Sequence, residues 1–248
     1  MAPKRLLVVY DFDWSMADQD TDRYIFEVND IELRRRMEDL EDRMQWTDLV
    51  AMSLREFHER GGTREQIESA LKNMPFHPAM VRALKGLKQA ADPETTLFCL
   101  SNANSVFIST ILQDKGLVEL FTEIVTNPAE WDESGLLELR RRVDPAGVQH
   151  GCKVGCSANM CKGEELKAFF ERHKPEFDQV IYVGDGGNDY CPTLRLRRHV
   201  RQDTVLCRRQ KGLEKRIETE GPKDGLQCQV VKWTQAWEVE EYYKANCS

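Results

Sequence analysis

The chain has 248 residues, of which 41% are hydrophobic and 31% charged, and it carries a formal net charge of −7. This length suits one large α/β domain or a core with a modest insertion, and two full domains would be crowded. The acidic balance gives no support for a nucleic-acid partner or an anionic membrane surface, because such partners attract concentrated positive charge. We therefore expect neither a nucleic acid nor a membrane as a partner.

The first ten residues combine charge with a short apolar run. Lys4 and Arg5 precede an apolar run over residues 6–10, which is too short for the central region of a secretory signal. No later stretch is long and apolar enough to span a bilayer. We expect a cytoplasmic protein, whose eight cysteines are free and mostly buried thiols in a reducing compartment.

Six short runs of apolar or β-branched residues, bounded by turn residues, predict strands. They cover residues 4–10, 95–100, 123–126, 179–183, 204–207 and 229–233. Segments with helical periodicity lie between most of them, and strands that alternate with helices form mainly parallel sheets. The sequence therefore predicts an α/β fold.

Residues 23–73 interrupt this alternation, because they carry no strand signal. Apolar residues recur at helical spacing over 31–44 and again over 49–57. The pattern Thr63-x-x-Gln66 is a capping box that begins a further helix. We expect an all-helical insertion directly after the first strand, ending near Pro75 and Pro78.

Two polar loops follow the first two predicted strands. Asp11 and Asp13 come after the first strand, where one carboxylate can face a substrate while the other does a different task. A D-x-D pair by itself is also common in acidic surface loops. Ser101 and Asn102 end the second strand and could hold phosphate oxygens, although both residue types also end strands as turn formers.

Two further loops complete the pattern. Lys162 opens a predicted helix, where it could place fixed positive charge on a phosphoryl group beside the helix N-terminus. The stretch GDGGND places Asp185 and Asp189 after the fourth strand, with glycines that permit a sharp turn. These carboxylates project toward the same sheet edge as Asp11, where ligands bind in parallel sheets, and they suit a hard cation.

The four loops resemble those of the haloacid dehalogenase superfamily of phosphohydrolases, along the whole chain. Within it, the chain is similar to the phosphoethanolamine/phosphocholine phosphatase family, which includes pyridoxal phosphate phosphatases and plant relatives. The stretches that carry this resemblance are DFDWSMADQDTD, LSNAN, TNPAEWDESGLLELR, HGCKVGCSANMCKGEEL and YVGDGGNDYCP. The resemblance implies a Rossmann-like catalytic core over residues 1–17 and 81–248, with a helical cap over residues 18–80.

The resemblance also implies an activity, namely the hydrolysis of a small phosphorylated metabolite through an aspartyl-phosphate. It assigns Asp11 as the nucleophile and Asp13 as the general acid and base. Ser101, the backbone at Asn102, and Lys162 would hold the transferring phosphoryl oxygens. An ionised carboxylate can approach a phosphate dianion only if cations neutralise the charge, so Mg²⁺ is expected as the cofactor.

The resemblance further implies a metal site and a head-group contact. Mg²⁺ would be held by the Asp11 carboxylate, the Asp13 backbone carbonyl, Asp185 and water, with Asp189 as a second ligand or as an acid behind the ligands. Asp22 matches a family position linked to cationic head groups. The animal enzymes carry an aspartate where this chain has Asn102, and the missing carboxylate should weaken a preference for choline or ethanolamine.

Two other functions and two structural alternatives stay open. The same residues could serve a phosphotransferase or mutase, or a pseudo-phosphatase that only binds a phosphometabolite, although a binding protein has no need of the acid Asp13. His150, Cys152, Cys156 and Cys161 could hold structural zinc, but their spacing is not that of a standard knuckle and buried cysteines also serve as apolar filler.

Overall fold

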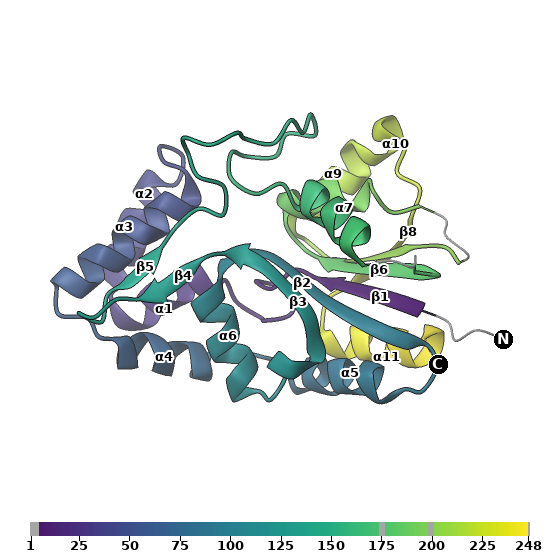
Figure 1. Ribbon diagram of the computed structural model, residues 1–248, viewed down its shortest axis with the longest axis horizontal. Coiled ribbons are helices and arrows are strands. Elements are labelled where there is room, and N and C mark those ends of the chain that lie inside the picture. Colours follow the sequence, from purple (N-terminus) through teal and green to yellow (C-terminus); the bar gives the residue numbers. More distant parts are fainter. Residues whose placement is uncertain (1–4, 174–176, 198–200, 248) are drawn as a thin grey trace.

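The computed structural model describes residues 5–173, 177–197 and 201–247, and its centre is a six-stranded sheet (Figure 1). All pairs of neighbouring strands in this sheet are parallel, in the order β3-β2-β1-β6-β7-β8. The strands are β1 (Arg5–Tyr10), β2 (Glu94–Asn104), β3 (Phe121–Asn127), β6 (Gln179–Gly184), β7 (Thr204–Arg208) and β8 (Gln229–Trp233). The six predicted strands and the α/β class are confirmed; Lys4, where the first strand was expected to begin, lies outside the described residues.

Helices bury both faces of the sheet. Side chains of β1 alternate between the two faces, with Val8 and Tyr10 in one apolar cluster and Leu7 and Val9 in the other. The covering helices are α5 (Pro78–Gln89), α6 (Ser105–Asp114) and α11 (Ala236–Asn246) on the first face, and α7 (Lys162–Arg172) and α9 (Gly212–Thr219) on the second. Strands buried on both faces are apolar throughout, which explains why the strand signal was clear in the sequence.

Four helices lie between β1 and α5 and form the insertion that was expected there. They are α1 (Thr21–Asn29), α2 (Ile31–Leu40), α3 (Trp46–Glu59) and α4 (Arg64–Asn73). The capping box of Thr63 and Gln66 is present at the start of α4. The insertion begins earlier than the apolar spacing predicted, because the Asp20 side chain accepts a hydrogen bond from the Arg23 amide (3.0 Å) and so caps α1. We call α1–α4 the cap.

A hairpin and a long irregular loop follow β3. The hairpin pairs β4 (Ala129–Trp131) with β5 (Leu137–Leu139). β5 packs against α3 of the cap. Residues 140–161 contain neither helix nor strand and lead to α7. The remaining short elements are η1 (Val118–Leu120), η2 (Gly187–Asp189), α8 (Tyr190–Thr193) and α10 (Gly221–Asp224).

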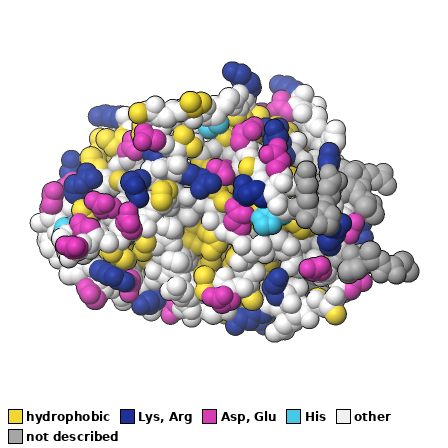
Figure 2. Space-filling model, viewed as in Figure 1, with side chains coloured by type: hydrophobic (Ala, Val, Ile, Leu, Met, Phe, Trp, Pro, Cys, Tyr) yellow, Lys and Arg dark blue, Asp and Glu magenta, His cyan; other side chains and the backbone are white. Residues whose placement is uncertain are grey.

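The surface is mixed in charge, and the described helices are short. Figure 2 shows basic and acidic side chains interspersed over the visible face. Among the described residues, no helix has both the length and the apolar character that a bilayer crossing requires.

Candidate active site

The four polar loops meet at one edge of the sheet. Asp11 follows the last residue of β1, and Asp185 follows the last residue of β6. β1 lies between β2 and β6, and Tyr10 is in register with Cys99 on one side and Val183 on the other. β1 and β6 end together, and β2 runs past them to Asn104, so the polar residues at this edge of the sheet face one cleft beneath the cap.

Lys162 joins the candidate nucleophile to the last acid of the GDGGND loop. Its Nζ lies 2.8 Å from Asp11 Oδ1 and 2.7 Å from Asp189 Oδ1, and the side chain is buried. Burial acts to lower the pKa of Lys162, but the charges of Asp11 and Asp189 outweigh burial and leave this pKa raised. A permanently protonated ammonium group therefore rests against Asp11.

Asp189 uses both carboxylate oxygens for hydrogen bonds within the protein. Besides Lys162, Oδ1 accepts from the Tyr182 hydroxyl (2.7 Å), and Oδ2 accepts from the amides of Asp185 (3.0 Å) and Gly186 (2.9 Å). A side chain at Gly184 would place its Cβ 2.8 Å from Asp189 Cγ, so the glycine makes room for this arrangement. The geometry favours a supporting role for Asp189, in which it positions the residues around a metal ion without binding the ion itself. Direct metal binding would compete with these hydrogen bonds.

The acids at this edge form a group that could bind a divalent cation. Asp11, Asp185 and Asp189 each offer a carboxylate oxygen, and these oxygens lie within 4.8 Å of one another. Burial and then the charge of Asp189 raise the pKa of Asp185 to about 7, and the same two causes hold the pKa of Asp11 well above its ordinary value. A hard cation would relieve the repulsion among buried carboxylates of this kind, and Asp11 and Asp185 could hold it.

Asp13 contacts the start of the cap instead of the sheet. Its Oδ1 accepts from the Thr21 amide (3.0 Å) and its Oδ2 from the Thr21 hydroxyl (3.2 Å). Burial, followed by the charges of Asp20 and Asp22, raises the pKa of Asp13 well above its ordinary value. A raised pKa favours the protonated carboxyl, which is the form that a general acid needs.

Asp22 lies on the first turn of α1 and faces the same cleft. Its Oδ2 accepts from Trp46 Nε1 (2.8 Å), whereas its Oδ1 is buried and has no hydrogen-bond partner among the described residues. Burial and then the neighbouring Asp20 raise the pKa of Asp22 to about 7. A buried carboxylate oxygen without a partner can accept a hydrogen bond from a ligand.

Ser101 and Asn102 line the cleft from the end of β2. The Ser101 hydroxyl accepts from the Ala103 amide (3.2 Å), and Asn102 Oδ1 accepts from Asn188 Nδ2 (2.9 Å). Six of the eight predicted site residues line one cleft. Lys162 lines an adjoining cleft, and Asn102 lines both clefts. These six are Asp11, Asp13, Asp22, Ser101, Asn102 and Asp185, while Asp189 lies buried behind them.

Two cations near Trp14 were not predicted as site residues. Trp14 lines the cleft, and Lys211 Nζ lies 3.5 Å from the centre of its ring. Arg208 donates to the Trp14 carbonyl (2.6 Å) and to Asp18 Oδ1 (2.9 Å), which gives Asp18 a structural partner. The one available signal was position, because Arg208 ends β7 and Lys211 follows it at the same sheet edge.

The cap is tied to the core beside the cleft. Thr47, near the start of α3, accepts at Oγ1 from Asn127 (3.4 Å) and Asn159 (3.3 Å), and Asn159 Nδ2 also donates to Asn127 Oδ1 (2.8 Å). Arg141 forms an ion pair with Asp48 of α3. The end of β3 and the 140–161 loop therefore hold the cap over the catalytic edge.

Sequence comparison identifies relatives over most of the chain. Residues 6–246 match the model of the Putative Phosphatase family. Inorganic pyrophosphatase 2 of Arabidopsis thaliana is 34% identical, over 77% of this chain and 67% of its own length. The thiamine phosphate phosphatase-like protein of Arabidopsis thaliana is 32% identical over 94% and 92%, and pyridoxal phosphate phosphatase PHOSPHO2 of Rattus norvegicus is 25% identical over 95% of each chain.

Solved structures share the fold at low sequence identity. A phosphoserine phosphatase in its apo form aligns with a TM-score of 0.57 at 15% identity, over 87% of this chain and 99% of its own. A HAD family hydrolase of Salmonella enterica aligns with a TM-score of 0.55 at 13% identity, over 77% of this chain and 60% of its own. The chain thus belongs to the Putative Phosphatase family and is a phosphoric monoester hydrolase, and its fold is that of the haloacid dehalogenase-type hydrolases.

Proposed function

We propose that this protein hydrolyses small phosphomonoesters in a Mg²⁺-dependent reaction that passes through an aspartyl-phosphate on Asp11. The observation that carries this proposal is the buried Lys162 ammonium, which lies 2.8 Å from Asp11 Oδ1 with Asp185 in the same group of acids. A carboxylate held beside a fixed cation and a cation-binding acid is equipped to attack a phosphate.

The first step transfers the phosphoryl group to the enzyme. Asp11 attacks the phosphorus, the bond from phosphorus to the leaving oxygen breaks, and Asp13 gives its proton to that oxygen. Lys162 and the Ser101 hydroxyl hold the transferring oxygens. When bound, Mg²⁺ supplies the additional positive charge that allows two anions to meet.

The second step releases inorganic phosphate. Asp13, now ionised, takes a proton from water as the water attacks the phosphorus, and the bond to Asp11 breaks. The Asp13 carboxylate is steadied in this state by its two hydrogen bonds from Thr21. The cap encloses the cleft and limits the access of other water.

The walls of the cleft favour a leaving group that carries nitrogen. Asp13, Asp20 and Asp22 make one side acidic, and Trp14 and Trp46 provide aromatic surface. The unpartnered Asp22 oxygen can accept a hydrogen bond from an amine or a protonated ring. We therefore expect phosphoethanolamine, phosphocholine, pyridoxal phosphate and thiamine phosphate to be better substrates than pyrophosphate, whose leaving group is an anion.

Phosphate release from these five compounds, with and without Mg²⁺, tests the proposal. Asp11→Asn should abolish turnover with an unchanged circular dichroism spectrum, whereas Asp39→Asn, at an exposed aspartate on α2, should behave as wild type. Appreciable hydrolysis by Asp11→Asn would remove Asp11 from the role of nucleophile. Phosphate transfer to added alcohols in preference to water would identify a phosphotransferase instead.

Asn102→Asp tests the contribution of residue 102 to head-group choice. The added carboxylate lies in the same cleft as Asp22 and should raise kcat/KM for phosphoethanolamine and phosphocholine relative to the other substrates. Unchanged relative values for these two compounds would show that charge at residue 102 does not set the preference.

A further inference from the structure

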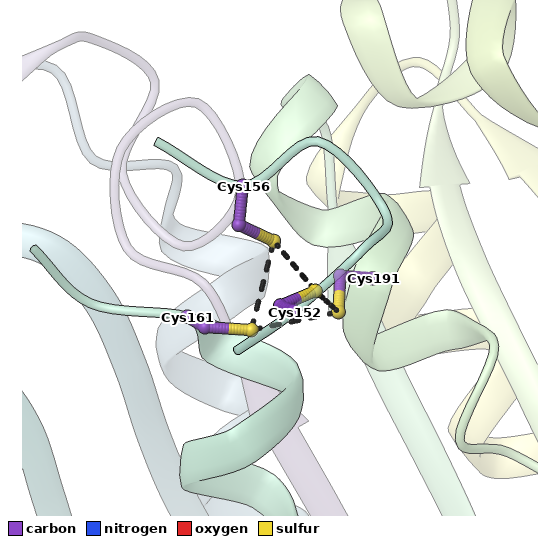
Figure 3. A group of neighbouring side chains, drawn as sticks. All are labelled: Cys152, Cys156, Cys161 and Cys191. Carbon is purple, nitrogen blue, oxygen red and sulfur yellow. Dashed lines mark hydrogen bonds between the residues drawn. The ribbon is translucent and has the colours of Figure 1, made fainter. Parts of the chain in front are cut away.

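Four of the eight cysteines meet in one cluster beside the active cleft, and the catalytic proposal makes no use of them. The cluster consists of Cys152, Cys156, Cys161 and Cys191 (Figure 3). The sequence left open whether His150 stands with Cys152, Cys156 and Cys161, and in the structure the fourth member of the group is Cys191. His150 Nε2 is bonded to the Ser157 carbonyl (2.8 Å), and Cys191 of α8 takes its place.

The sulfur atoms have the spacing of ligands around a single ion. Consecutive pairs around the cluster, 152–156, 156–161, 161–191 and 191–152, are separated by 3.7, 3.6, 3.6 and 3.5 Å. A tetrahedral zinc ion with Zn–S bonds of about 2.3 Å requires sulfur–sulfur distances of about 3.8 Å. A disulfide would require about 2.05 Å, and all four cysteines are free thiols.

The surroundings of the cluster also suit a metal site. Cys152 and Cys156 are only partly buried, which is unusual for cysteines that serve as apolar filler. The Val154 amide donates to Cys152 Sγ (3.4 Å), as amides do to thiolate ligands. At Gly163, an added Cβ would lie 2.5 Å from Cys191 Sγ, so the glycine leaves space for that sulfur atom.

The cluster organises a segment that has no other regular structure. Residues 140–161 contain neither helix nor strand, and loops of this length are uncommon unless they are functional or fixed by other means. Cys156, Ser157 and Met160 of this loop line the adjoining cleft, which also contains Lys162. Arg216 binds the loop at the Val154 carbonyl (2.8 Å) and places positive charge near the thiols. A metal ion would give this wall of the cleft a fixed anchor.

We propose that Cys152, Cys156, Cys161 and Cys191 bind one structural Zn²⁺ ion, separate from the Mg²⁺ site. Four sulfur ligands in a tetrahedral arrangement select zinc or iron, whereas Mg²⁺ requires oxygen ligands. The short distances among all four sulfur atoms fit a single ion, because an iron–sulfur cluster spreads its cysteines over several irons.

Zinc at this position would connect two segments of the active site. Cys161 directly precedes Lys162, and Cys191 follows Asp189 by two residues. The ion would thus fix the position of Lys162 relative to Asp189, whose Oδ1 lies 2.7 Å from Lys162 Nζ. This consequence rests on the proposed catalytic role of Lys162, whereas the binding of zinc does not.

The metal content of the full chain, purified without chelators from zinc-supplemented cells, tests the proposal. We expect about one zinc per chain in wild type, and at most a tenth of that in Cys191→Ser and in Cys152→Ser. Cys247→Ser, a buried cysteine near the end of α11, and His150→Ala should retain the full amount. The His150→Ala variant distinguishes the four-cysteine cluster from the alternative set in which His150 stands in place of Cys191.

Two measurements on wild type remain decisive if the serine variants fail to fold. Replacement of zinc by Co²⁺ should give the intense visible absorption of a tetrahedral cobalt thiolate. Titration with a mercurial should release one zinc as it reacts with four thiols that were protected, and removal of zinc with a chelator under reducing conditions should lower the melting temperature. Wild type without zinc, bound iron, a disulfide within the cluster, or zinc retained in Cys191→Ser would each overturn the proposal.

Activity assays keep this proposal distinct from the catalytic one. Zinc-free protein saturated with Mg²⁺ should lose at least tenfold in kcat and recover on zinc addition. If zinc binds but the protein hydrolyses no phosphomonoester, the catalytic proposal fails and the zinc site stands. If hydrolysis is normal in wild type that contains no zinc, the zinc site fails and the catalytic proposal stands.

Discussion

Replacement of Asp22 by asparagine should make the stability of the Mg²⁺-free protein less sensitive to rising pH. The unfolding free energy of the variant, compared with that of wild type, should therefore be more favourable at pH 8 than at pH 5. Asp22 is 3% exposed, and the pKa of its carboxyl is raised from 3.8 to about 7, mainly by burial. Because the folded-state value is the higher one, the protonated carboxyl contributes stability at low pH. This contribution is lost as the pH rises from about 4 through 7.

The size of the effect follows from the two pKa values. A carboxyl with pKa 3.8 in the unfolded chain and about 7 in the folded chain adds about 3 kcal/mol at pH 5 and close to zero at pH 8. Asparagine has no proton to lose, so the variant escapes this change. The difference in unfolding free energy, variant minus wild type, should therefore increase by about 3 kcal/mol between pH 5 and pH 8.

Urea denaturation at pH 5 and pH 8, followed by circular dichroism, measures this difference. Asp39→Asn, on the exposed side of α2, is the matched control and should show no such trend. If the difference between Asp22→Asn and wild type is the same at both pH values, Asp22 is ionised throughout and the burial argument is refuted. The Trp46 hydrogen bond would then be strong enough to hold the charge.

Three other changes are expected to have measurable effects. Lys162→Met should lower kcat/KM by about 10³-fold in phosphate-release assays, because it removes the cation beside Asp11; a loss below tenfold would contradict this role. Gly184→Ala should reduce the unfolding free energy by roughly 1–3 kcal/mol in urea titrations, because its Cβ would lie 2.8 Å from Asp189 Cγ; an unchanged midpoint would contradict the close packing. The apparent affinity for Mg²⁺, measured by calorimetry, should rise as the pH increases from 6 to 8, because the pKa of Asp185 is about 7 and the cation must displace its proton; an affinity independent of pH would show that Asp185 is already ionised.

Much of the catalytic edge could be predicted because topology placed it. Asp11 and Asp185 each follow an apolar run, and parallel strands bring such positions to one edge whatever the intervening chain does. The helical insertion was also readable, because its apolar spacing switched from strand to helix periodicity. These inferences required the order of the elements but not the direction of any side chain.

The details that depend on side-chain direction were out of reach. His150 is near Cys152 in sequence, yet Cys191 is the residue that completes the cluster, because α8 turns its cysteine toward the 140–161 loop. The sequence left Asp189 as either a ligand or a supporting acid, and the four hydrogen bonds that favour the second appear only in the folded structure. Lys211 offered only its position after β7 as a signal, because its contact with Trp14 depends on how two loops approach each other.

The hydrogen bonds between Asp13 and Thr21 have a mechanical consequence. Asp11 is anchored to the central strands, since its amide donates to the Val183 carbonyl (2.9 Å). Asp13, two residues later, is held by the first residue of the first cap helix. The two carboxylates are therefore held by different parts of the fold, Asp11 by the sheet and Asp13 by the start of α1. If the proposed roles hold, any tilt of α1 would move the proposed proton donor relative to the proposed nucleophile.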